Sequence, residues 1–334
     1  MTRVSRSERR GVWGTMSGPP LSGEYEKRVN RVIDHIREHL ADALTLSDLA
    51  RVAAFSPFHF HRVFSAITGE TLFGFIQRVR IERAAGALSS HPDQSVLVVA
   101  LDHGFSSAAA FARAFRTRFG MSATEWRAGG AERWRAQQAR ATARLHRNQG
   151  EANRKRGKAT GLARGDTSRK RSGEVAMNVR VTELPAHHVA YMRYVGPYGA
   201  HGIPDLWKKL RKWMETHDLL SDQTVTLGVA YDDPDITAPD RCRYDACVVV
   251  PADFVADRWV NVTDVPGGRF AVTEFVGTAH EIRAAWEALY RSWLPGSGYE
   301  PDDRPCFEIY RARVSVEGKP GAFRCELCMP VRPL

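Results

Sequence analysis

Apolar residues recur at helical spacing along the first third of the chain. In EYEKRVNRVIDHIREHL, residues 24–40, they fall every three or four positions, which predicts an amphipathic helix. The stretches 56–69 and 107–120 have the same spacing, and each begins with serine and ends with glycine. Serine favours helix N-caps and glycine favours C-caps, so both stretches are expected to form complete short helices.

These two short stretches are copies of one another. At an offset of 51 residues, SPFHFHRVFSAITG aligns with SAAAFARAFRTRFG, with shared serine, phenylalanine, arginine and glycine positions. A short helical segment and a turn precede each copy, at 44–55 and 95–105, and residues 73–89 predict a helix that joins the copies. A short helix, a turn and a second helix form a helix-turn-helix. The region therefore predicts an all-α double helix-turn-helix domain.

The residues of this region resemble the AraC/XylS family of transcription regulators over about 25–128. The resemblance rests on Arg62 and Phe64 in the first copy, on Arg113 and Phe115 in the second, and on the spacer between them. It implies binding to double-stranded promoter DNA, contact with RNA polymerase and, by the habit of the family, activation of transcription. One chain carries both helices, so a monomer can reach two major-groove faces about 34 Å apart, and a homodimer is also compatible.

The C-terminal half contains a second internal repeat. VRVTELPAHHVAYMRYVG, residues 179–196, recurs as VNVTDVPGGRFAVTEFVG, residues 260–277, at an offset of 81. An amphipathic stretch and then two strand-like stretches follow each copy. Two units of the order β-α-β-β therefore predict a pseudo-symmetric α+β domain with a central cleft, which makes the chain multidomain. This half resembles the GyrI-like effector-binding domain, chiefly in YVGPYGAHGIPDLWKKL and PCFEIY, and the resemblance implies a small-molecule effector.

Charge and composition divide the chain into four parts: a disordered N-terminal tail at 1–22, the helix-turn-helix domain at 23–130, a basic linker at 131–176 and the effector-binding domain at 177–334. Lys and Arg outnumber Asp and Glu by 17 to 12 before residue 131 and by 13 to 4 in the linker, and number 18 against 22 afterwards. A basic N-terminal part fits a nucleic-acid partner. The linker either adds weak phosphate contacts or only tethers the domains.

The location of the protein follows from what the chain lacks. No apolar run reaches the length of a membrane span, and no hydrophobic segment follows the basic N-terminus as in a secretory signal. Five cysteines, an odd number, argue against a disulfide framework. We therefore expect a cytoplasmic protein with no membrane partner and no cofactor. Translation starts at Met1 or at Met16.

Three side chains of the first copy are expected to reach DNA bases. A recognition helix reads base edges with its first two turns, where Phe58, His61 and Arg62 point outward and Phe60 and Phe64 point to the core. Arg62 can pair with guanine, and Phe58 can touch a thymine methyl. The alternative role for Arg62 is a salt bridge within the domain.

The second copy presents mainly alanines at the corresponding outward positions, which carry no hydrogen-bonding code. We expect Arg113, Arg116 and Arg118 to contact phosphates and to position the protein. Sequence specificity should then reside in the first half-site.

Glu308 is the most informative residue of the C-terminal half. It lies in the strand-like stretch RPCFEIY, where both faces carry apolar or aromatic neighbours, and burying an unpaired carboxylate there is costly. At an offset of 79 its mate in the first unit is Val229, so the fold accepts an apolar residue at that place. A structural role, with Glu308 neutral or paired with Arg193 or Arg311, is one interpretation.

A ligand-binding role is the other interpretation of Glu308. Tyr310 shares its strand face, and Trp286, Tyr290 and Trp293 follow one stripe of the neighbouring helix, although a core would use the same stripe. A carboxylate beside aromatic rings suits a cationic or aromatic effector. In domains that resemble this one, the equivalent acid is the central ligand-binding residue.

Two further functions stay open for the C-terminal half. Glu308 could act as a general base with a raised pKa, aided by Tyr310 or Tyr191, in a small-molecule hydrolase. The domain could also bind and sequester a drug without any transcriptional output. Tyr191 is counted among the effector-binding residues in either case.

Two short patterns resemble metal sites. His35, Glu38 and His39 match a zinc-peptidase pattern, but they fall on the first predicted helix. Cys325 and Cys328 have metal-like spacing, but residues three apart on a strand face opposite ways. We expect no metal at either place.

Overall fold

The computed structural model describes residues 23–138, 140, 177–198, 202–311 and 321–334. The predicted N-terminal tail and most of the predicted linker lie outside these residues. The chain is helical from 131 to 138, directly after the predicted end of the DNA-binding domain. Within the described part of the chain, no helix has the length and apolar character needed to cross a bilayer.

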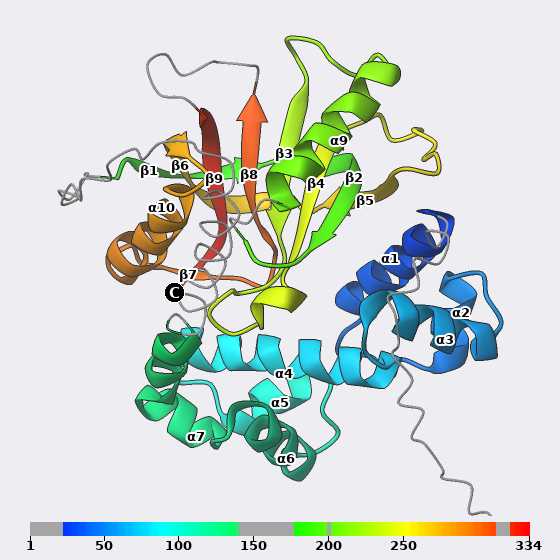
Figure 1. Cartoon of the computed structure of the whole chain (residues 1–334). Helices are drawn as coiled ribbons and strands as arrows, with labels where there is room; N and C mark the ends of the chain where they lie inside the picture. Colours follow the sequence, from blue (N-terminus) through cyan, green and yellow to red (C-terminus); the bar gives the residue numbers. More distant parts are fainter. Residues whose placement is uncertain (1–22, 139, 141–176, 199–201, 312–320) are drawn as a thin grey trace, which may run out of the picture.

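The N-terminal domain consists of short helices on either side of one long helix (Figure 1). They are α1 (Gly23–Glu38), α2 (Leu46–Val52), α3 (Pro57–Thr68), α4 (Leu72–Ser90), α5 (Val96–Asp102), α6 (Ala108–Phe119) and α7 (Ala123–Glu125). Ser56 and Ser107 cap α3 and α6, and Gly69 and Gly120 end these helices in the left-handed conformation. The predicted double helix-turn-helix is confirmed, with both sets of caps.

Each helix-turn-helix has its own hydrophobic core. Phe60 and Phe64 of α3 are fully buried in the first core, and Phe111 and Phe115 of α6 are buried in the second. The N-terminal part of α4 packs in the first core and its C-terminal part packs in the second. Because α4 belongs to both cores, it fixes the spacing of α3 and α6.

The C-terminal domain is built on an antiparallel sheet. Its strands are β1 (Val179–Leu184), β2 (His187–Val195), β3 (Val225–Ala230), β4 (Arg243–Val249), β5 (Asn261–Val265), β6 (Gly268–Thr278), β7 (Tyr299–Pro301), β8 (Cys306–Arg311) and β9 (Ala322–Pro333). The order is β1-β6-β9-β8-β3-β4-β2-β5, with β7 beside β9. This order is symmetric about the β8–β3 pair, which confirms the predicted α+β pseudo-symmetry.

One detail of the predicted repeat is wrong, because each unit starts with two strands before its helix. Proline or glycine breaks the first stretch into β1 and β2 in one unit and into β5 and β6 in the other. These strands pair across the units, β1 with β6 and β5 with β2. The exchange joins the two units into one sheet.

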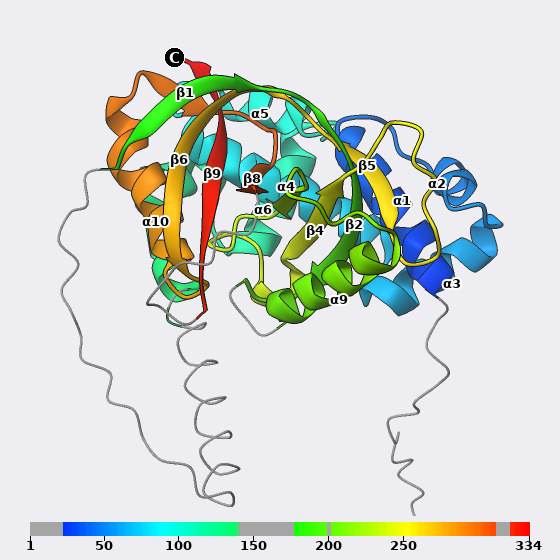
Figure 2. The same ribbon diagram turned by 90° about the horizontal axis from the view of Figure 1, so that it is seen from above.

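The two faces of the sheet have different neighbours. Helices α9 (Gly202–Thr216) and α10 (Ile282–Ala288), the latter continued by a π-helical turn at Leu289–Trp293, cover one face, which we call the helix face (Figures 1 and 2). The opposite face carries an apolar cluster that includes Leu227, Phe270 and Phe307.

The two domains are joined by a buried ionic cluster. The Arg193 guanidinium of β2 donates to Asp34 Oδ1 of α1 at 2.8 Å and to Asp245 Oδ2 of β4 at 2.7 Å. Arg37 lies against the ring of Tyr231, 4.1 Å from its centroid. Since buried charges need partners, this cluster ties α1 to the sheet.

Candidate DNA-binding and effector-binding sites

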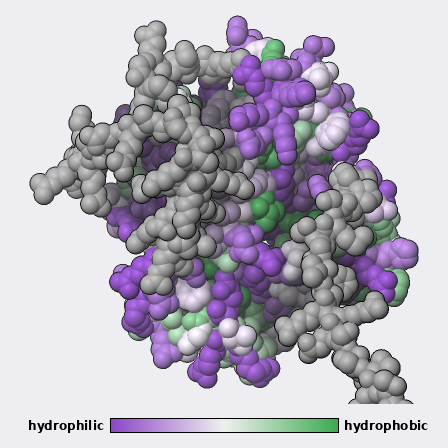
Figure 3. Space-filling model, in the orientation of Figure 1, coloured by the Kyte–Doolittle hydropathy of each residue, from purple (hydrophilic) through white to green (hydrophobic). Residues whose placement is uncertain are grey.

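The first two turns of α3 present the side chains predicted to read DNA. Phe58, His61 and Arg62 are exposed, whereas Phe60 and Phe64 are buried. The Arg62 guanidinium lies 4.4 Å from the centroid of the Phe58 ring. Arg62 forms no salt bridge with any described residue, so its alternative role within the domain finds no support. The surface in the view of Figure 3 is mainly hydrophilic, with small separate hydrophobic areas.

On α6, the three predicted phosphate-binding arginines are not equivalent. Arg113 and Arg116 are exposed and have no ion-pair partner among the described residues. Arg118 donates to Glu82 Oε1 at 2.8 Å and to the Ile236 carbonyl oxygen at 3.1 Å. The guanidinium of Arg118 is therefore occupied within the molecule. We correct its assignment from phosphate contact to domain contact.

Three aromatic side chains donate hydrogen bonds to Glu308. Tyr310 Oη and Tyr244 Oη donate to Glu308 Oε2 at 2.8 and 3.0 Å, and Trp286 Nε1 donates to Oε1 at 3.3 Å. Glu308 itself is 9% exposed. The alternative in which Glu308 pairs with Arg193 or Arg311 finds no support, because Arg193 binds Asp34 and Asp245 and Arg311 binds Glu326. Within the described part of the chain, the carboxylate is held by neutral donors alone.

Glu308 lies at the pseudo-twofold axis of the domain. It is directly opposite Gly228 in the central β3–β8 pair. The first strands of the two units are equivalent at an offset of 81 residues. Following this equivalence along the strand pairs, from β2 to β4 and β3 in one unit and from β6 to β9 and β8 in the other, makes Gly228 the equivalent of Glu308. The predicted mate, Val229, is wrong, since Val229 packs with Phe307 on the opposite face.

Gly228 leaves the space that this site requires. A Cβ at this position would lie 2.0 Å from Tyr244 Oη and 2.7 Å from Glu308 Oε2, far inside contact distance. Only glycine allows both groups to meet above β3.

An aromatic shell surrounds these groups on the helix face. Trp207 of α9 donates through Nε1 to Tyr244 Oη at 3.3 Å, and its ring packs edge-on against Tyr310 at 5.2 Å between centroids. Phe323 also packs against Tyr310, at 5.7 Å between ring centroids. The shell therefore draws side chains from both units.

The three aromatic residues predicted to line the site from α10 and the π-helical turn after it have different neighbours. Trp286 reaches Glu308, but Tyr290 turns to Cys306, with its Oη 3.0 Å from Sγ. Trp293 stacks on Tyr299 at 6.4 Å, next to an apolar cluster that includes Met329. Of the three predicted residues, the structure brings only Trp286 to the carboxylate.

Tyr191 lies on the other face of the sheet, so its placement in the effector site is wrong. It is 1% exposed, and its hydroxyl donates to Asp34 of α1. Alternation along β2 turns it away from the helix face. Tyr191 belongs to the ionic cluster between the domains.

Burial raises the pKa of the Glu308 carboxyl above its ordinary value of 4.5, and the hydrogen bonds from Tyr310, Tyr244 and Trp286 oppose this shift. Burial also raises the pKa values of Tyr244 and Tyr310 well above 10.0. Both tyrosines therefore stay neutral donors at physiological pH.

Sequence reasoning missed Tyr244 and Trp207. A signal for Trp207 was present, because Trp207 and Trp286 are 79 residues apart and lie in the second turns of α9 and α10, the helices of the two units. Tyr244 had no such signal. Its role depends on Gly228, which only the strand register identifies.

The described residues contain no group of three or more His, Cys, Asp or Glu side chains placed to hold a metal ion. Cys325 and Cys328 are both buried and pack in different apolar clusters. Both therefore belong to the apolar core of the domain.

Comparisons with known proteins match both halves of the chain. The profile of the GyrI-like small molecule binding domain matches residues 177–332, and that of a helix-turn-helix domain matches residues 49–129. DNA gyrase inhibitor 2 of Dickeya dadantii is 32% identical over 160 residues, which span 47% of this chain and 97% of that protein. The DNA gyrase inhibitor of Escherichia fergusonii is 29% identical over 160 residues, 47% of this chain and 99% of that protein.

Among solved structures, the DNA-binding domain of AdpA in complex with a target DNA is 30% identical, with a TM-score of 0.30, and the match covers 32% of this chain and 96% of that one. The chain therefore belongs to the GyrI-like family through its C-terminal half, and it joins that small-molecule-binding domain to an AraC-type helix-turn-helix DNA-binding domain.

Proposed function

We propose that the protein is a one-component transcription regulator in which an effector at Glu308 changes the affinity of the N-terminal domain for a promoter. The observation that carries this proposal is the buried carboxylate of Glu308, which has three neutral aromatic donors and no cationic partner among the described residues. A buried carboxylate without a cation favours a ligand that supplies the positive charge.

The effector class follows from the shell. Trp207, Trp286 and Tyr310 present aromatic rings beside the carboxylate. Such rings attract cations and stack on aromatic groups. We propose a small cationic or aromatic effector, which would take over the carboxylate from at least one of its donors.

The DNA-reading surface is proposed to be α3, with Arg62 and Phe58 on base edges and His61 beside them. Arg113 and Arg116 on α6 would contact phosphates. Activation, contact with RNA polymerase, a cytoplasmic location, and binding as a monomer or homodimer belong to the same proposal. These features are carried over from the resemblance to AraC-type regulators.

Calorimetric titration of the full chain with a panel of aromatic cations tests the effector site. Wild type should bind at least one cation saturably, and Glu308→Gln should weaken that binding by about tenfold or more, the effect of losing one charge-assisted interaction. Lys208→Gln, a change at an exposed side chain of α9, serves as the control. Equal binding by all three proteins would contradict the proposed site.

A hydrolase is the second candidate function, and the raised pKa of Glu308 beside Tyr310 favours it. Tyr191 cannot assist, because it lies on the other sheet face. Mass spectrometry of a ligand recovered after incubation separates the two functions. Recovery of the unchanged ligand supports effector binding, and a product that disappears with Glu308→Gln supports hydrolysis.

A further inference from the structure

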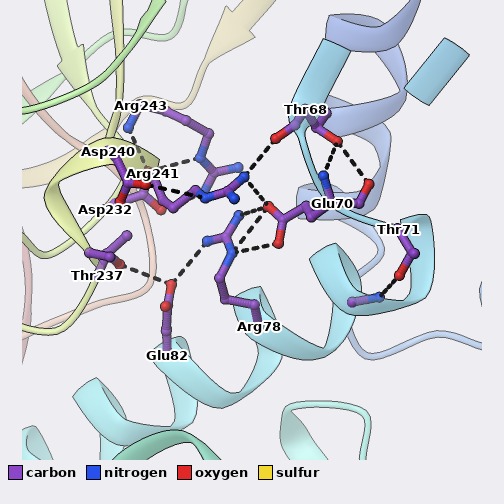
Figure 4. A network of polar contacts seen from close by, with 12 residues as sticks. Thr68, Glu70, Thr71, Arg78, Glu82, Asp232, Thr237, Asp240, Arg241 and Arg243 are labelled. Atoms are coloured by element: carbon purple, nitrogen blue, oxygen red, sulfur yellow. Dashed lines mark hydrogen bonds and ion pairs between the residues drawn. The ribbon is translucent and has the colours of Figure 1, made fainter. Parts of the chain in front are cut away.

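One segment of the effector-binding domain touches both helix-turn-helix units. Residues 231–242 connect β3 to β4, and we call this segment the bridging loop. Figures 1 and 4 show it directly beside α4. Its base is closed by the ion pair of Arg243 with Asp232, at 2.6 Å.

The tip of the bridging loop completes the core of the second helix-turn-helix. Ile236 is 1% exposed and packs in the same cluster as Phe115, Phe119 and Trp126. Its Cδ1 atom also lies above Gly86 of α4. A core residue of the DNA-binding domain is thus supplied by the effector-binding domain.

Polar contacts fix the same tip to α4 and α6. Thr237 Oγ1 donates to Glu82 Oε2 at 3.0 Å, and Arg118 bridges Glu82 and the Ile236 carbonyl oxygen (Figure 4 shows Thr237 and Glu82). Arg78 completes the ring of donors to Glu82, at 3.1 Å. Because these polar groups are largely buried and are hydrogen-bonded to one another, they fix the position of the loop tip relative to α4 and α6.

The other end of the loop holds the end of α3. Arg241 Nη1 donates to the carbonyl oxygen of Thr68, the last residue of α3, at 2.6 Å, and lies 3.5 Å from Glu70 Oε1 (Figure 4). A cation that binds the last carbonyl groups of a helix stabilises its C-terminus. The bridging loop therefore contacts the C-terminal ends of both α3 and α6.

The same loop leads directly to the effector site. Tyr244, which donates to Glu308, is the second residue of β4 and follows Arg243, which closes the loop base. Tyr198 Oη donates to the Arg243 carbonyl oxygen at 2.7 Å, and its ring packs near that of Tyr244. Only Cys242 and Arg243 separate Tyr244 from Arg241.

We propose that Ile236 and Arg241 are positioning residues that set the orientation of α3 relative to α6. When an effector displaces Tyr244, the bridging loop shifts and thereby changes the positions of both helices. The second part rests on the proposed function of the Glu308 site. Neither residue lies on the DNA-reading turns of α3, so their effect on DNA binding is indirect.

The positioning role is tested on the full chain with Ile236→Ala and Arg241→Gln. Val255→Ala and Arg211→Gln, at exposed sites of the C-terminal domain, are the matched controls. Hydrogen exchange should accelerate about tenfold in α6 for Ile236→Ala and in the last turn of α3 for Arg241→Gln, and the controls should leave both helices unchanged. Unchanged exchange in both helices would overturn the positioning role.

A DNA readout separates positioning from loss of stability. A duplex selected by wild type from random sequence is compared with a shortened duplex that ends before the second half-site and so lacks the phosphates that α6 would contact. Both variants should lose about tenfold affinity for the full-length duplex and less than about twofold for the shortened one. Equal losses on both duplexes would show general destabilisation and would contradict positioning.

Transmission from the effector site to α3 and α6 is tested by amide hydrogen exchange in the presence of benzyltrimethylammonium, which serves as the effector probe. Bound probe should change exchange in residues 231–242 and at the ends of α3 and α6, and Tyr244→Phe should reproduce part of that change without probe. If calorimetry shows binding but exchange at both helices stays constant, transmission is wrong. If the probe and the other cations do not bind wild type, the proposed effector site fails, while the two variants above still decide the positioning role.

Discussion

Glu308 and Gly228 face each other across the central strand pair, on the pseudo-twofold axis of the C-terminal domain. The two units thus place different residues at equivalent positions, a carboxylate in one and no side chain in the other. The absence of a side chain at Gly228 lets Tyr244 reach the carboxylate. A symmetric scaffold has in this way produced a single asymmetric site.

Gly228→Ala should disrupt the site while leaving the sheet in place. The new Cβ would collide with Tyr244 Oη and Glu308 Oε2, so cation affinity should fall by about tenfold or more. Calorimetric titration measures this loss. Gly296→Ala is the matched control, because its Cβ would meet nothing within 4 Å. Wild-type affinity in Gly228→Ala would show that Tyr244 has no part in the site.

The ionisation of Glu308 should make stability depend on pH. Burial raises its pKa in the folded state above the unfolded value near 4.5, so the folded state binds the proton more tightly. The unfolding free energy should therefore fall as pH rises from 4.5 through the folded-state pKa. Glu308→Gln lacks this titration, so its stability relative to wild type should improve with rising pH.

Urea denaturation of both proteins between about pH 4 and pH 8 measures this difference. Affinity for a cation should rise with pH over the same window, because only the carboxylate attracts it. A constant stability difference across the range would mean that Glu308 has an ordinary pKa.

Arg193→Ala should destabilise the joined domains strongly. It would leave Asp245 buried without its cation and Asp34 with only the longer contact to Arg37, at 3.8 Å, a loss of about 3–5 kcal/mol in unfolding free energy. Arg211→Ala, which breaks an exposed pair with Glu215, should cost less than about 1 kcal/mol. Denaturant titration compares the two, and similar losses would contradict the importance of the ionic cluster.

Two arginines should differ in how they contribute to DNA binding. Arg62→Ala should cost about 1–3 kcal/mol on a selected duplex and relax the preference at one base pair. Arg113→Ala should weaken binding to all duplexes alike. It should also lower the slope of log affinity against log salt concentration by about one, the loss of one phosphate contact. Fluorescence anisotropy at several salt concentrations measures both effects. Identical profiles for the two variants would contradict the division between base and phosphate contacts.

Local signals predicted the helical domain well. Serine and glycine caps at Ser56, Gly69, Ser107 and Gly120 are set by neighbouring backbone groups, so the sequence contains them directly. The strand repeat was also visible, but its register was not. A shift of one residue reverses the face of every side chain, which is why an offset of 79 points to Val229 and the true register to Gly228.

The candidate site was predicted only where residues neighbour one another in sequence or on one helix. Glu308, Tyr310 and Trp286 were found in this way. Arg118 and Tyr191 were misplaced because their partners, Glu82 and Asp34, belong to distant elements and to the contact between domains. Docking of two domains leaves no periodic signal in either one.

If the effector binds at Glu308, occupancy of this site should change DNA binding by the full chain. The most direct test measures affinity for a selected duplex with and without a saturating aromatic cation, for wild type and for Glu308→Gln. We expect the affinity for DNA to change by about fivefold or more in wild type, within the usual range of coupling between sites, and to stay unchanged in the variant. Equal affinity of wild type with and without a cation that calorimetry shows to be bound would contradict this expectation.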